Sequence, residues 1–151
     1  MCPERITWDG IPISAERPYG ATAVIFKRSS SGLQLLMLHR AHHGADFEGD
    51  WAWTPPAGAR QPGEAVEDCA QRELREETGL QLPLRATACG DGDWYVFVGE
   101  APMDAVVVLD AEHDRYEWIA PAIAIQRCLP SASQEPLRAV THLLSHETDG
   151  S

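Results

Sequence analysis

The sequence has few basic residues and no long apolar run. Lysine and arginine together number 12 against 23 aspartates and glutamates, which gives a net charge of −11 over 151 residues. This excess of negative charge disfavours general nucleic-acid binding, because phosphate backbones require a positive protein surface. No segment approaches the roughly 20 apolar residues of a membrane span, and residues 1–10 lack the apolar stretch of a signal peptide. We therefore expect a cytoplasmic protein whose partner is neither a nucleic-acid polymer nor a membrane.

The four cysteines lack the spacing of a metal or redox site. They stand far apart in the sequence, and no two of them are separated as in a zinc finger or a redox motif. Reduced and partly buried thiols, as in cytosolic proteins, are the simpler expectation. These residues are Cys2, Cys69, Cys89 and Cys128.

Length and composition indicate one globular domain. The hydrophobic fraction of 44% and the charged fraction of 23% are ordinary for such a domain. We find no internal repeat, linker or low-complexity segment, so we expect a single domain over residues 1–151. Within it, residues 1–20 contain three prolines and are expected to form an arm or a short edge strand, and residues 147–151 are expected to fray.

The first half of the chain predicts a hairpin followed by a loop. Residues 21–28 and 33–39 are β-compatible apolar runs, and the serines and glycine between them suit a tight turn. Residues 41–50 are polar and contain two glycines, which indicates a loop, and a short strand at 51–54 is stopped by two prolines. Further strands are expected at residues 81–88, 94–99, 105–109 and 116–119.

Apolar periodicity and capping residues predict the helices. The first, at residues 64–78, has an apolar stripe that recurs every four residues, and Gly79 follows it as a residue able to adopt positive φ. A short helix from Pro121 to about Arg127 and a longer one that begins after Ser133 come later. Strands with helices on both faces would bury these stripes, which indicates an α/β fold. The stripes consist of Val66, Ala70 and Leu74 in the first helix and of Leu137, Val140 and Leu144 in the last.

Three glutamates lie on one face of the first helix. Glu73, Glu76 and Glu77 fall within an arc of roughly 100°, because each helical residue advances by about 100°. Carboxylates at this spacing repel one another and weaken a helix unless their charge is compensated. A hard divalent cation bound by oxygen ligands would compensate it. The alternative, a solvated acidic face, is the ordinary explanation when such a run stands alone.

The stretch from Gly58 to Leu80 resembles the box of the Nudix hydrolase family. The family pattern is a glycine, five residues, a glutamate, seven residues, Arg-Glu, an aliphatic residue, any residue, Glu-Glu, any residue, a glycine and an aliphatic residue. A complete match at this many fixed places is far more specific than a lone glycine-rich loop. The fixed places are filled by Gly58, Glu64, Arg72, Glu73, Leu74, Glu76, Glu77, Gly79 and Leu80.

The resemblance implies a fold and an activity. The fold is an α/β/α sandwich around a mixed β-sheet. The activity is divalent-metal-dependent hydrolysis of a pyrophosphate bond in a nucleoside diphosphate linked to another moiety, with Mg²⁺ or Mn²⁺ as cofactor. Nucleoside triphosphates and dinucleoside polyphosphates are the first substrates implied, nucleotide sugars come next, and a homodimer is the implied assembly. The alternative is a non-catalytic nucleotide- or metal-sensing module on the same fold, although such domains often lose box glutamates that this chain keeps.

The resemblance also assigns roles within the box. Glu73 and Glu77 are the first metal ligands and Glu76 is the next, while Arg72 orients and partly neutralises Glu73 as the catalytic carboxylate. For Arg72 the alternative is a surface pair with Glu76 four residues on. The backbone carbonyl of Ala57 is the implied further ligand, although many members have a second glycine there and alanine restricts the backbone more. Structural roles are expected for Gly58, Glu64 and Gly79.

Charged candidates outside the box are less specific. Family members often use an acid from a later loop as base or extra ligand. Glu112 is the candidate because it lies between two strand-like segments, and Asp114 and Glu117 compete with it. Arg40 ends the second predicted strand and is expected to meet substrate phosphates, with a solvated strand end as the alternative.

Aromatic side chains near the loops are candidates for stacking on a nucleotide base. We choose Trp53 and Tyr95, with Trp51 and Trp94 beside them, and core packing is the alternative for each. Tyr95 lies 15 residues beyond Leu80, where some family members that hydrolyse dinucleoside polyphosphates carry a tyrosine.

Histidines cluster near the first loop without the pattern of a zinc site. His39, His42 and His43 would need further nitrogen or sulfur donors to bind zinc, and nothing in the sequence places them. We expect surface or phosphate-facing side chains here. For His113 ordinary exposure to solvent is expected, with contact with the substrate as the alternative.

Overall fold

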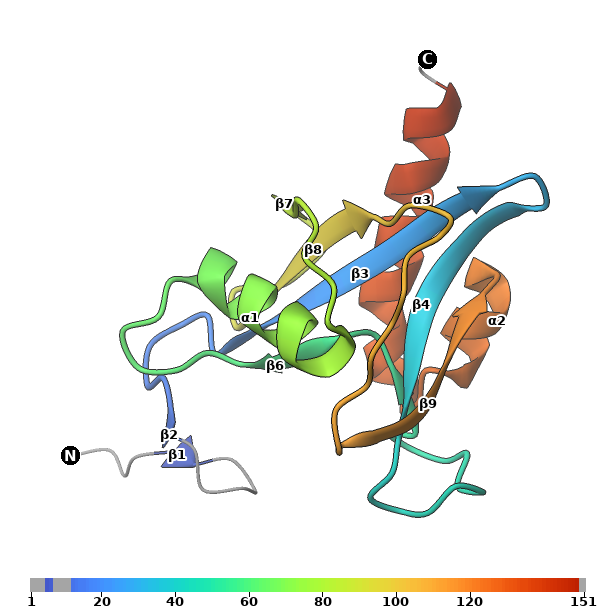
Figure 1. Cartoon of the computed structure of the whole chain (residues 1–151). Helices are drawn as coiled ribbons and strands as arrows, with labels where there is room; N and C mark the ends of the chain where they lie inside the picture. Colours follow the sequence, from blue (N-terminus) through green and yellow to red (C-terminus); the bar gives the residue numbers. More distant parts are fainter. Residues whose placement is uncertain (1–4, 7–11, 150–151) are drawn as a thin grey trace.

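The computed structural model describes residues 5–6 and 12–149 and is built on a central β-hairpin (Figure 1). β3 (Gly20–Ser29) and β4 (Gly32–Arg40) are antiparallel, as the sequence predicts. At their connection Gly32 has φ 117°, a left-handed conformation that glycine adopts without strain. The hydroxyl of Ser29 donates a hydrogen bond to the Gly32 carbonyl over 2.9 Å, which closes the turn.

Further strands extend this hairpin into a mixed sheet. β8 (Trp94–Glu100) runs parallel to β3, and β9 (His113–Ile119) runs antiparallel to β4. The sheet also contains β5 (Trp53–Thr54) beside β4, β6 (Ala57–Ala59) beside β3 and β7 (Arg85–Ala86) beside β8. A separate two-stranded ribbon is formed by β1 (Arg5–Ile6) and β2 (Pro12–Ile13).

Helices cover both faces of the sheet (Figure 1). Successive strand residues point to opposite faces, so β3 supplies both apolar layers. On one face Ile25 belongs to a buried cluster with Leu74 of α1, and on the other Val24 belongs to a cluster with Val140 of α3. The expected α/β/α sandwich is confirmed. Its helices are α1 (Val66–Thr78), α2 (Pro121–Arg127), the 3₁₀ turn η1 (Ser131–Ser133) and α3 (Gln134–Asp149).

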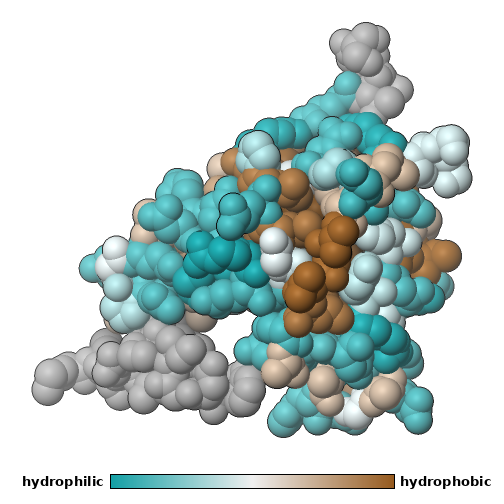
Figure 2. Space-filling view, viewed as in Figure 1, coloured by the Kyte–Doolittle hydropathy of each residue, from teal (hydrophilic) through white to brown (hydrophobic). Residues whose placement is uncertain are grey.

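Residues 105–109 are not a strand, although their burial alternates as in one. Val107 is 9% exposed, whereas Val106 and Val108 are 73% and 65% exposed. The N–H of Val108 donates to the carbonyl of Thr78 over 2.8 Å, so the segment lies against the end of α1. Figure 2 shows the apolar side chains gathered over this segment on a largely hydrophilic face. The alternation therefore indicates one buried face, and a helix end buries it instead of a neighbouring strand.

Several predicted boundaries also differ. The strand expected at 81–88 is reduced to β7, and those expected at 51–54 and 116–119 begin at Trp53 and His113. The helix predicted from residue 64 begins at Val66.

The last helix extends into the segment that the sequence predicts to fray. α3 continues through Asp149, where fraying from residue 147 is expected, and Glu147 pairs with Arg85 at the edge of the sheet. Residues 1–4, 7–11 and 150–151, which include Cys2 and part of the predicted N-terminal arm, lie outside the described part of the chain. Within that part, no helix has the length and apolar character needed to cross a bilayer.

Candidate active site

The carboxylates of the box are positioned by α1 and by β6, which precedes it. Val66, Ala70 and Leu74 are buried and fix the helix against the sheet, as their spacing predicts. Gly79 ends the helix with φ 73°, and its N–H donates to the carbonyl of Arg75 over 2.9 Å. The polar face of the helix that remains is thereby turned toward the loop around β6.

Arg72 is the centre of the hydrogen-bond network on that face. Its guanidinium donates to both oxygens of Glu64, over 2.7 and 3.0 Å, in a bidentate arrangement. It also donates to Glu73 over 2.8 Å, to Glu76 over 3.2 Å and to the carbonyl of Ala59 over 3.0 Å. Arg72 is therefore more than a surface i,i+4 partner of Glu76, because it links the helix to β6.

Glu64 ties the loop before α1 to the helix. Besides its bonds to Arg72, one of its oxygens accepts the N–H of Gln61 over 3.1 Å, and its carbonyl accepts Arg60 over 3.0 Å. Burial tends to raise the pKa of the Glu64 carboxyl, but the bonds from Arg72 and Gln61 hold it below its ordinary value. These contacts agree with the structural role predicted for Glu64.

The carboxylates of Glu73 and Glu77 are largely buried. Glu77 is only 4% exposed, and one of its oxygens accepts the N–H of Ala57 over 3.0 Å. The side chain of Glu73 is 14% exposed and packs directly over Gly58, where an added Cβ would lie 2.1 Å from the Glu73 carboxyl carbon. The Glu73 carboxylate thus occupies the space that a side chain at position 58 would need, so a larger residue there would displace it.

The ionisation of these two acids reflects their burial. Desolvation raises the pKa of Glu73 to about 7, although the adjacent Arg72 opposes this shift. Desolvation and then the neighbouring charge of Glu73 raise the pKa of Glu77 to about 9. Two buried acids that disfavour each other's charge, with no cationic partner for Glu77 among the described residues, fit a divalent cation bound through oxygen. Glu76 is more exposed, at 52% of its side chain, and lies at the outer side of this group.

Glu112 comes to the same place from the segment before β9. One ligand atom each from Glu77, Glu112 and His113 lies within 4.8 Å of the others. The carbonyl of Glu112 accepts the N–H of Ala41 over 2.9 Å, which fixes this segment to the end of β4. Of the acids considered outside the box, Glu112 is therefore the one that stands beside Glu77.

The two competing acids are engaged elsewhere. Asp114 contacts Nδ1 of His39 at 2.8 Å, and Glu117 pairs with Arg127 at 2.7 Å. His39 is fully buried and also contacts the carbonyl of Phe47 through Nε2 at 2.6 Å. The expectation of a surface or phosphate-facing His39 is therefore wrong, since this imidazole is a structural link between β4 and β9.

His113 is also buried, contrary to the sequence prediction. It is 6% exposed, and its Nδ1 lies 2.8 Å from an oxygen of Asp110. The spacing of Asp110 and His113, three residues apart in a loop rich in acids, is the signal that could have indicated the contact. Burial itself depends on the packing of β9 against β4 and is not visible in the sequence.

A cleft of about 390 Å³ opens beside the acidic group. Two backbone hydrogen bonds hold its walls together: Arg40 N–H donates to the Ala52 carbonyl, and Ala41 N–H donates to the Glu112 carbonyl, both over 2.9 Å. Arg40 is exposed and lines this cleft, and its contact with phosphates stays a prediction. The lining residues are Arg40, Ala41, His42, His43, Trp51, Ala111 and Glu112.

Among the tryptophans, the structure offers Trp51 to the cleft and not Trp53. Trp53 is 2% exposed and belongs to the core under α3, with its ring edge-on to His39 at 5.0 Å, so its predicted contact with a substrate base is not supported. Trp51 is 50% exposed, lines the cleft and has φ 67°, a conformation that bulky residues rarely adopt. Its N–H donates to the Leu129 carbonyl over 2.7 Å, which holds the backbone in place.

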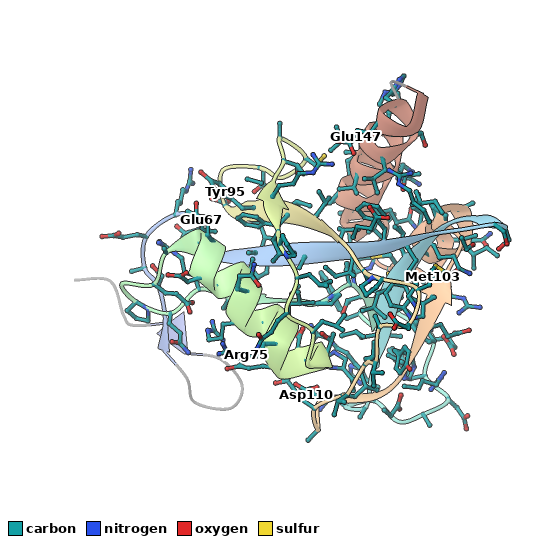
Figure 3. All side chains as sticks on the ribbon, turned by 45° about the horizontal axis from the view of Figure 1, so that its top comes forward. Glu67, Arg75, Tyr95, Met103, Asp110 and Glu147 are labelled. Atoms are coloured by element: carbon teal, nitrogen blue, oxygen red, sulfur yellow. The ribbon has the colours of Figure 1, made fainter. Side chains whose placement is uncertain are left out.

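Tyr95 lies away from the cleft. It pairs in register with Ala21, which packs against Val66 at the start of α1, whereas Glu77 stands in the last turn of that helix. Eleven helical residues span about 16 Å. Figure 3 shows Tyr95 near Glu67 at one end of α1, with Asp110 near the other end. Tyr95 and the acidic group therefore do not belong to one compact site.

The comparison with known sequences identifies the family. Residues 17–142 match the NUDIX domain. The chain belongs to the Nudix family. The match extends well beyond the box and includes the cleft residues of the Nudix domain described above.

Curated relatives of this Nudix chain have diverse activities. It is 31% identical over 131 residues to an octanoyltransferase of Myxococcus xanthus, a match that covers 79% of this chain and 35% of that protein. It is 31% identical over 118 residues to an isopentenyl-diphosphate Delta-isomerase of Halorhodospira halophila, with 70% and 65% covered. Nucleoside triphosphatase NudI of Escherichia coli O1:K1 is 27% identical over 121 residues, with 68% and 84% covered. The chain thus spans about a third of the first relative and just under two thirds of the second.

Solved structures share the Nudix fold. The Nudix hydrolase RenU of M. smegmatis has a TM-score of 0.68 at 21% identity, with 93% of this chain and 95% of that chain covered. A C. elegans Ap4A hydrolase has a TM-score of 0.64 at 22% identity, with 84% and 98% covered. At these identities the likeness shows the fold.

Proposed function

We propose that this chain hydrolyses a pyrophosphate bond in a nucleoside diphosphate linked to another moiety, with Mg²⁺ or Mn²⁺ as cofactor. The observation that carries the proposal is the placement of the buried Glu77 beside Glu112, next to a cleft lined by Arg40 and Trp51. The Nudix relatives differ in activity, so the family by itself does not decide the reaction.

The metal would be held by the acidic side chains of the box. Glu73 and Glu77 are the proposed first ligands, Glu76 the next, and the carbonyl of Ala57 a backbone ligand. When bound, a hard divalent cation neutralises phosphate charge and favours attack by water. The N–H of Ala57 holds one oxygen of Glu77 in place, which leaves its other oxygen for a ligand.

Proton transfer is assigned to the carboxylates beside the substrate. Arg72 holds one oxygen of Glu73, so it positions this carboxylate and leaves its second oxygen for a reacting group. Burial raises the pKa of Glu73 to about 7 in the metal-free protein, and a bound cation would favour the ionised carboxylate that accepts a proton from water. Glu112, beside Glu77, is the second candidate for this proton transfer.

The substrate is placed in the cleft with its phosphates toward the acids. Arg40 supplies a positive charge for the phosphates, and Trp51 supplies an exposed aromatic face for a base. Nucleoside triphosphates and dinucleoside polyphosphates are the preferred classes, and nucleotide sugars come next. The description of one relative as a nucleoside triphosphatase, and of one structural neighbour as an Ap4A hydrolase, supports this preference.

Hydrolysis of a nucleotide panel tests the proposal. We expect turnover with Mg²⁺ or Mn²⁺ that is lost with a chelator, and a loss of about 10²–10⁴-fold in Glu77→Gln, whose amide oxygen can still accept the N–H of Ala57. The matched control is Glu67→Gln, at an exposed position of the same helix. Full activity of Glu77→Gln would contradict the site.

The alternative is a nucleotide- or metal-sensing module without turnover. A calorimetric titration that shows tight nucleotide binding, together with no product after prolonged incubation, would favour it. The complete set of box glutamates argues for the enzyme. A homodimer and a cytoplasmic location are further parts of this proposal that rest on sequence alone.

A further inference from the structure

We propose that Nε2 of His113 is a ligand of the divalent cation, together with Glu77 and Glu112. This inference rests on the metal site of the proposed function and adds a nitrogen donor to its oxygen ligands. A nitrogen ligand also makes the site more selective among divalent metals than a site built from carboxylates alone.

The three side chains are already close to coordinating distance. One ligand atom of each side chain, a ring nitrogen in the case of His113, lies within 4.8 Å of those of the other two. Bonds of about 2.0–2.2 Å to a first-row divalent ion place neighbouring ligand atoms about 3–3.5 Å apart. The group is therefore assembled before the cation binds, and side-chain shifts of about an ångström complete it.

The imidazole of His113 is oriented for this role by Asp110. Its Nδ1 lies 2.8 Å from the Asp110 carboxylate. A carboxylate at Nδ1 fixes the tautomer in which Nε2 carries the lone pair, as in carboxylate–histidine–metal arrangements. The side chain of His113 is 2% exposed, so a lone pair without a ligand would be held there at a cost.

The backbone keeps both donors of this segment at the cleft. His113 pairs in register with Arg40 across β9 and β4, and the adjacent Glu112 carbonyl accepts the N–H of Ala41. Glu77 is fixed from the other side by Ala57. The ligands thus come from two elements that are both anchored to the sheet.

A nitrogen ligand changes the preference for metals. Imidazole binds Mn²⁺, Co²⁺ and Zn²⁺ far better than Mg²⁺, which prefers oxygen and retains water. We therefore expect Mn²⁺ to bind the wild-type protein more tightly than Mg²⁺, and this difference to shrink when His113 is replaced.

The test is pulsed EPR of the Mn²⁺-loaded full chain, with calorimetric titration of Mn²⁺ and Mg²⁺. We expect nitrogen coupling to Mn²⁺ in the wild type and its loss in His113→Gln, with a tenfold or greater loss of Mn²⁺ affinity and little change for Mg²⁺. His142→Gln, at an exposed position of α3, is the matched control and should retain the coupling.

The outcomes separate this inference from the proposed function. If Glu77→Gln abolishes Mn²⁺ binding but the wild type shows no nitrogen coupling, the carboxylate site stands and the role of His113 is overturned. If no divalent metal binds at all, the proposed function itself fails. Should His113→Gln not fold, Asp110→Asn replaces it: we expect weaker coupling and Mn²⁺ affinity reduced severalfold, and an unchanged spectrum overturns the proposal.

Discussion

Arg72 of α1 donates hydrogen bonds to both carboxylate oxygens of Glu64, which lies in the loop before that helix. The two hydrogen bonds, 2.7 and 3.0 Å long, join the helix to the loop after β6, and the same guanidinium reaches Glu73. The side chains of Arg72 and Glu64 are 15% and 14% exposed, so this ion pair is shielded far more than a surface pair. The loop geometry and the position of Glu73 therefore depend on one side chain.

Replacement of Arg72 by lysine should impair both stability and catalysis. Lysine keeps the charge, but its ammonium group cannot form the bidentate hydrogen bonds to Glu64 and also bond to Glu73. We expect a loss of about 1–3 kcal/mol in the free energy of unfolding, measured with urea, and a fall in kcat of tenfold or more. Arg75→Lys, at an exposed position of α1, is the control. If Arg72→Lys had the same stability and the same kcat as this control, the hydrogen bonds of Arg72 would contribute to neither.

A methyl group at Gly58 should displace the catalytic carboxylate. The added Cβ would lie 2.1 Å from the carboxyl carbon of Glu73, so that side chain must move. We expect Gly58→Ala to lose activity by at least tenfold and to lose about 1–3 kcal/mol of stability through overpacking. Gly92→Ala is the matched substitution, since its Cβ meets nothing within 4 Å. Equal activity of the two variants would show that Glu73 is not held in the observed position.

The pH dependence of stability should carry the signature of Glu77. Its pKa is raised to about 9 in the folded chain by burial, against about 4.3 for an ordinary glutamate. Between these values the folded state binds more protons than the unfolded state, so the free energy of unfolding of the metal-free protein should fall as pH rises from about 5 to 9.

Glu77→Gln should remove the slope above about pH 7, leave below it the contribution of Glu73, whose pKa is raised to about 7, and be more stable than the wild type at pH 8 without metal. Urea denaturation in a chelator at pH 5, 6.5 and 8 measures both effects. Addition of Mg²⁺ or Mn²⁺ should stabilise the wild type at pH 8 and leave the variant nearly unchanged. Parallel pH profiles for the two proteins would contradict the buried, protonated Glu77.

Local sequence signals account for the half of the site that lies on one helix. The stripe of Val66, Ala70 and Leu74 determines which face of α1 is buried, and the box glutamates then follow from helical geometry. Gly79 is equally local, because its positive φ is required where the helix ends.

The other half depends on contacts between distant elements. Residues 105–109 alternate as a strand would, but Val108 is bonded to Thr78 at the end of a helix. His113 is buried only because β9 lies along β4, and no periodicity marks it. Trp51 and Trp53 stand two residues apart, yet Trp51 has a left-handed backbone and lines the cleft while Trp53 is buried, a difference that the sequence does not show.

Trp51 should be needed for substrates with an aromatic base. It lines the cleft, is half exposed and is held at φ 67° by its bond to Leu129. Stacking of a base on an aromatic side chain is worth about 1–3 kcal/mol. We therefore expect Trp51→Gly to raise KM for a nucleotide by about tenfold, and Trp51→Phe to restore most of the affinity.

The Trp51→Gly variant separates an effect on substrate binding from an effect on stability. Because glycine adopts the left-handed conformation freely, Trp51→Gly should unfold at the same or a higher temperature than the wild type even as its KM rises. Tyr95→Ala removes an exposed aromatic ring near the far end of α1 and should leave KM unchanged. If KM rose in Tyr95→Ala and stayed constant in Trp51→Gly, the base would lie near the start of α1, and the cleft beside Glu112 would not be the nucleotide site.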